Sequence, residues 1–267
     1  MKQMSPIPSV VIGLLVLVPA WTLAQSDPVD RFSVSLGAFI TDRNTSTRLD
    51  SATLGTGTGI DLEEDLGLDS SDSVVRLDGH YRFNQKHRVN FSVFDLSRDS
   101  SAAVQRDIQY GDRVFLLDTV VNANFDLTIY KLAYTYSVMQ RDNGYLGVTL
   151  GAYIADSKIG LAEQSLGQVE VREITAPLPV VGLRGEHRFS EKWSLRASGE
   201  VFALEYGDFK GSLYDLYVGL DYQLFDRMAI GAGFNSVRMD IGVTKENASG
   251  DLDWQYDGGL LFIKFEF

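Results

Sequence analysis

The stretch "GGLLFIKFEF", residues 258–267, alternates in character and ends on an aromatic side chain. From residue 261 onward, every second position is a large apolar residue: Leu261, Ile263, Phe265 and Phe267. A period of two is typical of a half-buried β-strand. Soluble domains usually finish in a few disordered polar residues. We therefore expect the last strand to continue to Phe267.

The same period recurs along the chain and predicts ten strands. They cover residues 32–40, 75–83, 88–93, 132–138, 145–154, 180–189, 193–201, 216–224, 228–234 and 258–267. An even number of alternating segments is typical of a transmembrane antiparallel up-and-down β-barrel, so the expected fold class is all-β. A soluble β-sandwich shows the same alternation and stays open as the alternative.

The connections between the predicted strands fall into two classes. Short polar links stand at residues 84–87, 141–144, 190–192 and 225–227, as expected of periplasmic turns. Longer connections centre on residues 55–59, 110–113, 165–168, 206–208 and 246–251. These predict extracellular hairpins, some of which project above the membrane. Both termini are then expected in the periplasm.

The two faces of the predicted strands differ in charge. One face has apolar residues such as Leu77 and Leu220, and the other has Arg76, Arg184 and Arg196. An arginine turned toward lipid costs about 2–4 kcal/mol near the midplane, so the charged face is expected inside. Aromatic residues gather near the short links, as in a membrane girdle. They are Tyr81, Phe83, Tyr134, Tyr136, Phe189, Trp193, Tyr222, Phe265 and Phe267.

Inward charges on neighbouring strands predict an ionic cluster in the lumen. If residues 190–192 and 206–208 are hairpin links, Arg196 lies opposite Glu186 on one side and Asp221 on the other. The link at 225–227 would set Asp215 opposite Arg238. Opposite charges directly across a sheet attract. The expected cluster comprises Arg196, Glu186, Asp221, Arg184, Glu200, Asp215 and Arg238.

The N-terminal segment has the pattern of a cleaved secretory signal. Lys2 precedes an apolar run at residues 10–18, and Pro19 and a small residue, Ala24, follow it. The run is about half of the roughly 20 residues that a spanning helix needs. We expect a signal peptide at residues 1–24 and one barrel domain at residues 25–267. The chain has no cysteine and a net charge of −12, which argues against disulfides, a lipid-anchored cysteine and nucleic-acid binding.

Few residues of the sequence indicate a catalytic or metal-binding role. A barrel enzyme acting on outer-leaflet substrates needs a rim histidine, but His80, His87 and His187 all lie near the expected periplasmic end. The acidic stretch at residues 61–72 has spacings only faintly like a calcium loop and is interpreted as a solvated face. We therefore expect no catalytic residue, no cofactor, no metal site and no enzymatic activity.

The signal segment, the ten strands, the alternation of short and long links and the terminal Phe267 resemble small porin-like outer-membrane β-barrel proteins of Gram-negative bacteria. The resemblance implies contact with outer-membrane lipid and lipopolysaccharide. It also implies that the barrel-assembly machinery reads the closing strand, with Ile263, Phe265 and Phe267 as the assembly signal. The sequence departs from that pattern at Phe262, where a glycine is expected.

Three functions follow from this interpretation. The leading one is a non-enzymatic outer-membrane protein with a structural or surface-interaction role, acting through extended acidic hairpins. The second is a narrow channel for small solutes, using gaps over inward glycines. Those glycines are Gly147, Gly151, Gly219, Gly231 and Gly233. The third is a lipid or peptide hydrolase.

Overall fold

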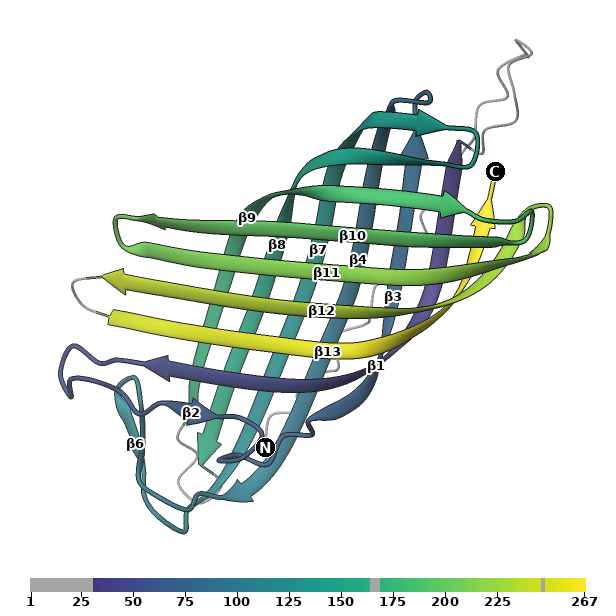
Figure 1. The fold of residues 1–267 in the computed structure, drawn as a ribbon. Helices are drawn as coiled ribbons and strands as arrows, with labels where there is room; N and C mark the ends of the chain where they lie inside the picture. The colour runs from purple at the N-terminus through teal and green to yellow at the C-terminus, as the bar shows by residue number, and fades with distance from the viewer. Residues whose placement is uncertain (1–30, 164–168, 246–247) are drawn as a thin grey trace, which may run out of the picture.

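The structure, a computed structural model, describes residues 31–163, 169–245 and 248–267. The predicted signal peptide lies outside this part of the chain. Ten long strands dominate the fold (Figure 1). They are β1 (Phe32–Leu49), β3 (Ser71–Arg82), β4 (His87–Ala103), β7 (Val120–Arg141), β8 (Gly144–Glu163), β9 (Val169–Arg188), β10 (Trp193–Tyr206), β11 (Phe209–Phe225), β12 (Met228–Lys245) and β13 (Ala248–Glu266).

Each long strand pairs antiparallel with the next one along the chain, and β13 pairs with β1 to close the ring. The predicted all-β up-and-down barrel of ten strands is therefore confirmed. Closure pairs the backbone polar groups around the ring near the short-turn end. Farther from that end, the β9–β10 ladder stops at Val181–Val201 and the β3–β4 ladder stops at Arg76–Phe94. Among the residues described, no helix is long and apolar enough to cross a membrane.

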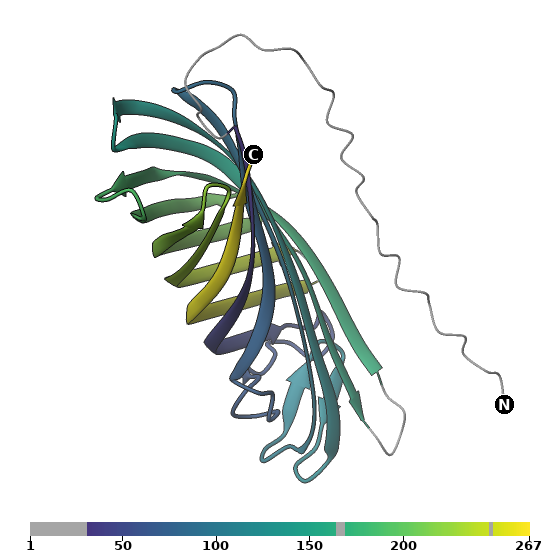
Figure 2. The same ribbon diagram turned by 90° about the vertical axis from the view of Figure 1, so that its right-hand side faces the viewer.

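The two ends of the barrel differ. At the short-turn end, β3–β4, β7–β8, β9–β10 and β11–β12 are joined by tight links, and Phe267 lies at this end too (Figures 1 and 2). At the long-hairpin end, the connection from β1 to β3 contains β2 (Ile60–Asp61). The connection from β4 to β7 contains the β5 (Ile108–Tyr110) and β6 (Arg113–Phe115) pair.

Two of the expected long connections are shorter than predicted. Strands β10 and β11 extend toward each other, so residues 207–208 form a tight turn. Strand β13 already begins at Ala248, which leaves little of the predicted loop at 246–251. The predicted loop at 165–168 lies outside the described residues. Long strands therefore build most of the long-hairpin end.

The faces of the strands exchange their character partway along the barrel, as β7 shows. Toward the short-turn end, its inward side chains are polar and its outward ones apolar, with Lys131 and Thr135 inside and Leu132 and Tyr134 outside. Toward the long-hairpin end the pattern reverses. There the buried side chains are Val121, Ala123, Phe125, Leu127 and Ile129, and the outward ones include Asn122, Asn124, Asp126 and Thr128.

A row of outward polar residues marks this exchange around the barrel. Asp95, Thr128, Asp156 and Thr175 are paired in sequence across β4, β7, β8 and β9. The Thr128 hydroxyl donates to Asp95 at 2.6 Å, and the Thr175 hydroxyl donates to Asp156 at 3.1 Å. Across the barrel, Asp42, Asp257 and Ser236 form the corresponding row. We call the segments on the short-turn side of these rows the spanning part and the rest the projecting part.

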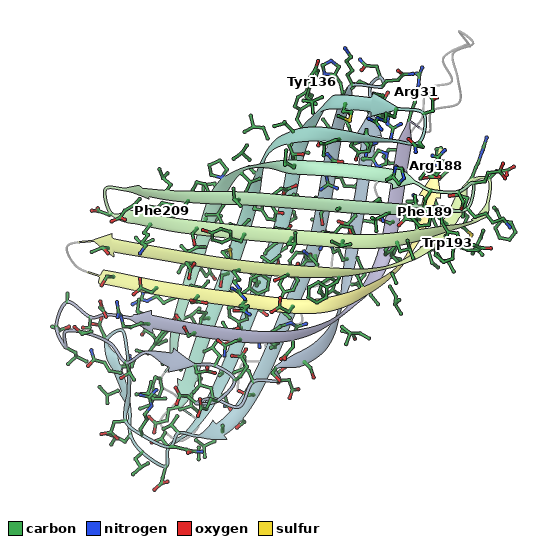
Figure 3. The ribbon with its side chains drawn as sticks, in the orientation of Figure 1. Arg31, Tyr136, Arg188, Phe189, Trp193 and Phe209 are labelled. Atoms are coloured by element: carbon green, nitrogen blue, oxygen red, sulfur yellow. The ribbon has the colours of Figure 1, made fainter. Side chains whose placement is uncertain are left out.

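The outer surface of the spanning part is apolar. Exposed residues there include Leu36, Ile40, Leu132, Leu150, Leu183, Leu216 and Leu261. Aromatic side chains ring its edge at the short-turn end, where Figure 3 shows Tyr136, Phe189 and Trp193. An apolar band edged by aromatic residues is the surface that a bilayer covers. Below the rows of polar residues, the barrel therefore has the outer surface of a membrane protein.

The interior of the projecting part is an apolar core. Phe125 and Leu127 from β7 meet Leu213 from β11 and Trp254 from β13, all at most 1% exposed. The two long connections cover this core at the long-hairpin end. They add Ile60, Leu62, Leu66, Leu68, Val104, Ile108, Tyr110 and Phe115 to it. We call residues 50–70 and 104–119 the cap. The outer face here contacts water, so burial of these side chains is favoured as in a soluble protein.

Candidate functional site

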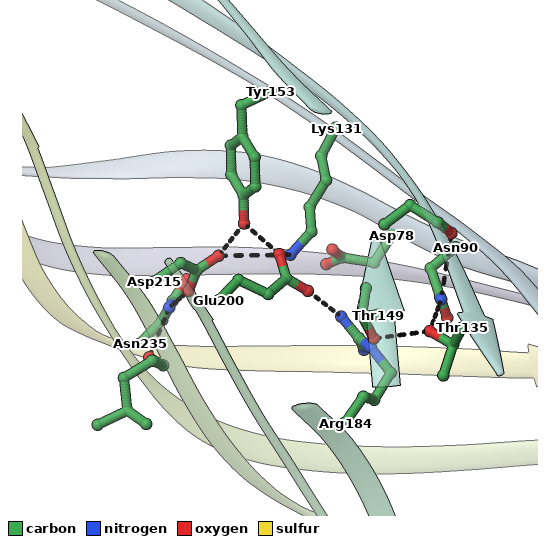
Figure 4. Close-up of polar contacts among 12 residues, drawn as sticks. Asp78, Asn90, Lys131, Thr135, Thr149, Tyr153, Arg184, Glu200, Asp215 and Asn235 are labelled. Carbon is green, nitrogen blue, oxygen red and sulfur yellow. Dashed lines mark hydrogen bonds and ion pairs between the residues drawn. The ribbon is translucent and has the colours of Figure 1, made fainter. Parts of the chain in front are cut away.

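The upper lumen of the spanning part contains two acids that lie directly opposite each other. Glu200 on β10 and Asp215 on β11 are cross-strand partners, and both are buried. Like charges in this position repel. Lys131 reaches across from β7 and sets its Nζ 2.6 Å from Glu200 Oε2 and 3.4 Å from Asp215 Oδ2 (Figure 4). Tyr153 on β8 contacts both carboxylates through its hydroxyl.

Asp215 connects this group, through Asn235, to Arg76 on β3. The Asn235 amide donates to Asp215 Oδ1 at 2.6 Å, and Arg76 Nη1 donates to Asn235 Oδ1 at 2.6 Å. Arg76 Nε also lies 3.0 Å from Asp78. The hydroxyl of Tyr256 donates to Asn235 Oδ1 at 2.8 Å. One hydrogen-bonded network therefore joins β3, β7, β8, β10, β11, β12 and β13 just below the apolar core.

A second ionic group lies closer to the short-turn end. Arg196 Nε on β10 is 2.9 Å from Asp221 Oδ2 on β11. Lys264 Nζ on β13 is 2.8 Å from the same Oδ2 atom and 2.8 Å from Glu266. Asp221 thus forms ion pairs with two cations at once. The ring of Phe262 lies beneath the Arg196 guanidinium, with 5.1 Å from Cζ to the ring centroid.

The structure brings Arg196 to Asp221, although their register differs from the expected one. Arg196 is paired with Gly219, two residues from the predicted partner. A shift by two residues keeps a side chain on the same face, so the diagonal contact still forms. Glu186 is paired with Arg196 in the β9–β10 ladder as expected. Within the described residues, however, these two side chains form no direct ion pair.

The predicted pairing of Asp215 with Arg238 is wrong. A β-bulge between Gln223 and Phe225 shifts the β11–β12 ladder by one residue. Asp215 is therefore paired with Val237, and Arg238 is paired with Tyr214 on the outer face. A one-residue shift moves a side chain to the opposite face of the sheet. Arg238 is consequently no member of the lumen cluster.

The predicted cluster lacks six members of the observed network: Arg76, Asp78, Lys131, Tyr153, Asn235 and Tyr256. Lys131 had a signal, because it is a single lysine between apolar neighbours at the point where the alternation of β7 reverses. Tyr153 and Asn235 had none, because an inward tyrosine or asparagine is also compatible with an ordinary packed lumen. Of the other predicted members, Arg184 contacts Glu200 at 3.4 Å (Figure 4).

A cavity remains between the two ionic groups. It has about 60 Å³ of room for the centres of water molecules. Its wall includes six cations, Arg76, Arg88, Lys131, Arg184, Arg196 and Lys264, and three carboxylates, Asp78, Glu186 and Asp215. His80 also lines it, whereas His87 contacts Tyr134 and His187 is exposed near the short-turn end.

The inward glycines do not form a channel through this region. A Cβ atom placed on Gly219 would lie 2.1 Å from the hydroxyl of Tyr217. A Cβ atom on Gly231 would lie 2.1 Å from the ring of Phe262. These two rings therefore occupy the space that the glycines leave. Phe262, where the family pattern expects glycine, is a lumen-filling residue.

Two acids of the stretch at residues 61–72, Asp61 and Glu63, form hydrogen bonds and an ion pair within the protein. Asp61 accepts backbone N–H bonds from Glu63 and Glu64 at 3.0 and 2.8 Å. Glu63 accepts the Thr45 N–H at 2.8 Å and pairs with Arg98. The interpretation as a wholly solvated face is therefore corrected. No group of three or more potential metal ligands occurs among the described residues.

Hydrogen bonds also hold the cap together and tie it to the barrel rim. The Ser249 hydroxyl and the Gly57 N–H both donate to Asp50, which lowers the pKa of that carboxyl. The Ser51 hydroxyl donates to Asp112 at 2.6 Å and lowers the pKa of Asp112 in the same way. Burial raises the pKa of Tyr110 to about 12. In the cap, hydrogen bonds therefore favour the ionised forms of Asp50 and Asp112, and burial favours the neutral form of Tyr110.

Comparison with known proteins places the fold. The outer membrane protease OmpT from Escherichia coli superimposes with a TM-score of 0.57 at 9% identity, covering 91% of this chain and 99% of that one. The attachment invasion locus protein Ail of Yersinia pestis gives 0.36 at 13% identity, covering 86% of this chain and 99% of Ail. The Pseudomonas putida toluene transporter TodX gives 0.34 at 8%, covering 90% and 91%. No family model and no curated protein matches the sequence.

The likeness to OmpT shows the fold, a β-barrel of the outer-membrane class. It also contradicts the prediction that the chain is not an enzyme, because OmpT is an outer membrane protease. The prediction rests on the lack of a rim histidine and takes the fold itself as evidence neither for nor against enzymatic activity. At 9% identity the likeness shows the fold alone, and it assigns no reaction to this chain.

Proposed function

We propose that this protein is a sealed outer-membrane barrel that acts at its long-hairpin end by binding cationic partners. The observation that carries the proposal is the exchange of faces. Above the rows of polar residues, the strands continue as a hydrated surface built on a solid apolar core. Such a surface is a rigid platform, and rigid surfaces lose little conformational entropy on binding.

The filled lumen favours this role over a solute channel. The apolar core and the cap close the projecting part, and the ionic network fills the upper spanning part. Rings of Tyr217 and Phe262 cover the inward glycines. Solute passage would require several of these layers to open together. A small barrel of ten strands has no spare diameter to bypass them.

The charge of the platform supports a cationic partner. Outward acids are spread over its strands and include Asp95, Asp99, Asp126, Asp156, Glu173, Asp240, Asp251 and Asp253. Asp95, Asp156 and Asp240 are held by hydroxyl donors rather than by cations. Their charge is therefore available to a partner, and complementary charge raises the rate of association.

Two measurements on the refolded protein test the proposal. Planar bilayers should show no steady conductance. A decalysine peptide should bind to the protein in nanodiscs, with affinity falling as salt rises. Changing Asp95, Asp156, Asp240 and Asp253 together to asparagine should weaken peptide binding at least tenfold. The matched control changes the short-turn acids Asp142, Glu191 and Asp226 to amides and should leave binding unchanged. Equal affinity in both variants, or stable open channels, would overturn the proposal.

The same proposal orients the barrel with its short-turn end in the periplasm, where both termini would lie. Lipopolysaccharide would then surround the upper edge of the apolar band. Ile263 and Phe265 point outward on β13 and Phe267 follows them, so all three are accessible to the assembly machinery before insertion. Phe267→Ser should lower the folded yield in cells more than Phe262→Leu. Equal yields would remove the assembly role from the terminus.

A further inference from the structure

The ion pairs around the cavity between the two ionic groups are unevenly distributed over the six cations of its wall. Asp78 is occupied by Arg76, and Asp215 is occupied by Lys131 and Asn235. Of the three carboxylates on the wall, only Glu186 has no direct ion pair within the described residues. Behind the wall, Glu200 and Asp221 each contact two cations, and Glu266 contacts Lys264.

Arg88 is the cation that this arrangement leaves without a carboxylate. It is 6% exposed and lines the cavity. Its described contacts are with Tyr145, whose hydroxyl accepts from Nη1 and whose ring centroid lies 4.2 Å from Cζ. Arg184 beside it reaches Glu200 only at 3.4 Å, and its buried Nε has no hydrogen-bond partner among the described residues. Glu186 can balance at most one of these two guanidinium groups.

We propose that this cavity is a binding site for a small free oxyanion of the phosphate class, held by Arg88 and Arg184. Guanidinium groups present paired N–H donors that match the oxygens of a tetrahedral oxyanion. A water molecule needs about 10–15 Å³ of such room, so the cavity has space for several waters or one small anion. A bound anion gives Arg88 the charged partner that it lacks, and burying an unpaired guanidinium is otherwise costly.

Access is from the short-turn end. The wall includes Ser33, Tyr145 and Lys264, which lie within three residues of the ends of their strands. The inward side chains of Arg184 and Arg196 keep 20% and 23% of their surface accessible, unlike the apolar core above them. The cap and the core close the opposite direction. The site is therefore a blind vestibule rather than part of a channel.

Calorimetric titration of the refolded full-length mature chain in detergent, with inorganic phosphate as the probe, tests the site. Wild type should bind one phosphate per barrel, and Arg88→Gln should weaken binding at least tenfold. Arg88 has no carboxylate partner, so its removal leaves no acid unpaired and the variant should fold. The matched control, Arg188→Gln, changes an exposed arginine near the same end and should leave the affinity unchanged.

Arg88→Lys provides a second variant if Arg88→Gln fails to refold. It keeps the charge but loses the paired donors, so phosphate should bind several-fold more weakly than to wild type. A cavity that holds only water would give no saturable heat with wild type. Equal affinities in wild type and either Arg88 variant would also overturn the site. Loss of binding in Arg188→Gln as severe as in Arg88→Gln would show a diffuse charge effect and would count equally against it.

Discussion

The two parts of this barrel have opposite interiors although the same strands run through both. In the spanning part, Lys131, Glu200 and Asp215 are inside and the outward residues are apolar. In the projecting part, Phe125 and Leu127 are inside and the outward residues are polar. The strands themselves continue across the boundary, although the β9–β10 and β3–β4 ladders end before it. The difference comes from the surroundings, because lipid removes the advantage of burying apolar side chains inside and water restores it.

Each part is therefore stabilised by a different class of interaction. The spanning part depends on the pairing of buried charges, since an ion removed from water needs compensating partners. The projecting part depends on packing, as in a soluble β-sandwich. Substitutions of each class should therefore be costly in one part and mild in the other.

The largest effect is expected from breaking the ionic network. Glu200→Ala removes the carboxylate that lies 2.6 Å from Lys131 and 3.4 Å from Arg184, leaving buried cations uncompensated. We expect the free energy of unfolding to fall by about 3–5 kcal/mol in denaturant titrations of the refolded protein. Glu173→Ala breaks an exposed ion pair with Lys158 and should cost less than about 1 kcal/mol. Similar costs for both variants would show that the network is unimportant for stability.

The next effect comes from the packed core. Leu127→Ala should cost about 2–5 kcal/mol, because Leu127 is fully buried and its removal leaves a cavity. Leu132→Ala on the same strand provides the matched control, since Leu132 is 62% exposed on the lipid-facing surface. Lipid chains fill the space there, so no cavity remains and the cost should be smaller. Equal losses in denaturant titrations would mean that the projecting part is not a conventional core.

A third, smaller effect concerns the cap and pH. Asp50 and Asp112 have pKa values lowered by hydroxyl donors, so their contribution is full above the unfolded-state pKa and is lost as pH falls through the folded value. Below about pH 4 the cap should loosen while the barrel remains closed. Cleavage of residues 50–70 by pepsin should therefore rise steeply with acidification. Asp50→Asn should be cleaved readily at a higher pH, and an unchanged cleavage profile would contradict this role.

The smallest effect is expected from an acid pair on the outer face of the projecting part. Asp240 and Asp253 are cross-strand partners, and partial burial together with the hydrogen bond between them raises the pKa of Asp253. The ionised form is therefore disfavoured in the folded state at neutral pH. Asp253→Asn should stabilise the protein by less than about 1 kcal/mol at pH 7. The gain should disappear below about pH 4, where both acids are protonated; a loss of stability at pH 7 would contradict the pair's repulsion.

Much of the spanning part could be predicted from residues alone. The outward set there, including Leu77, Leu150 and Leu220, is exposed as expected, and each predicted strand lies within an observed one or exceeds it by one residue. The sequence predicts projecting hairpins but not the strands that build them, because the alternation there has the opposite phase. On β7, the predicted strand begins at Leu132, and the reversed pattern at residues 120–129 is not assigned to a strand. The phase of the alternation, as well as its period, is the signal that identifies this segment.

Local pattern alone therefore determined the strands, their number and the direction of charged residues relative to lipid, because these depend on side-chain period and on the cost of charge in hydrocarbon. Tertiary structure decided which charges meet. Lys131 reaches Glu200 and Asp215 across the barrel, and one bulge at Gln223–Phe225 turned Arg238 to the outer face. Such contacts depend on strand register and on closure of the ring. A one-residue shift reverses every side chain of a strand, and no local pattern fixes it.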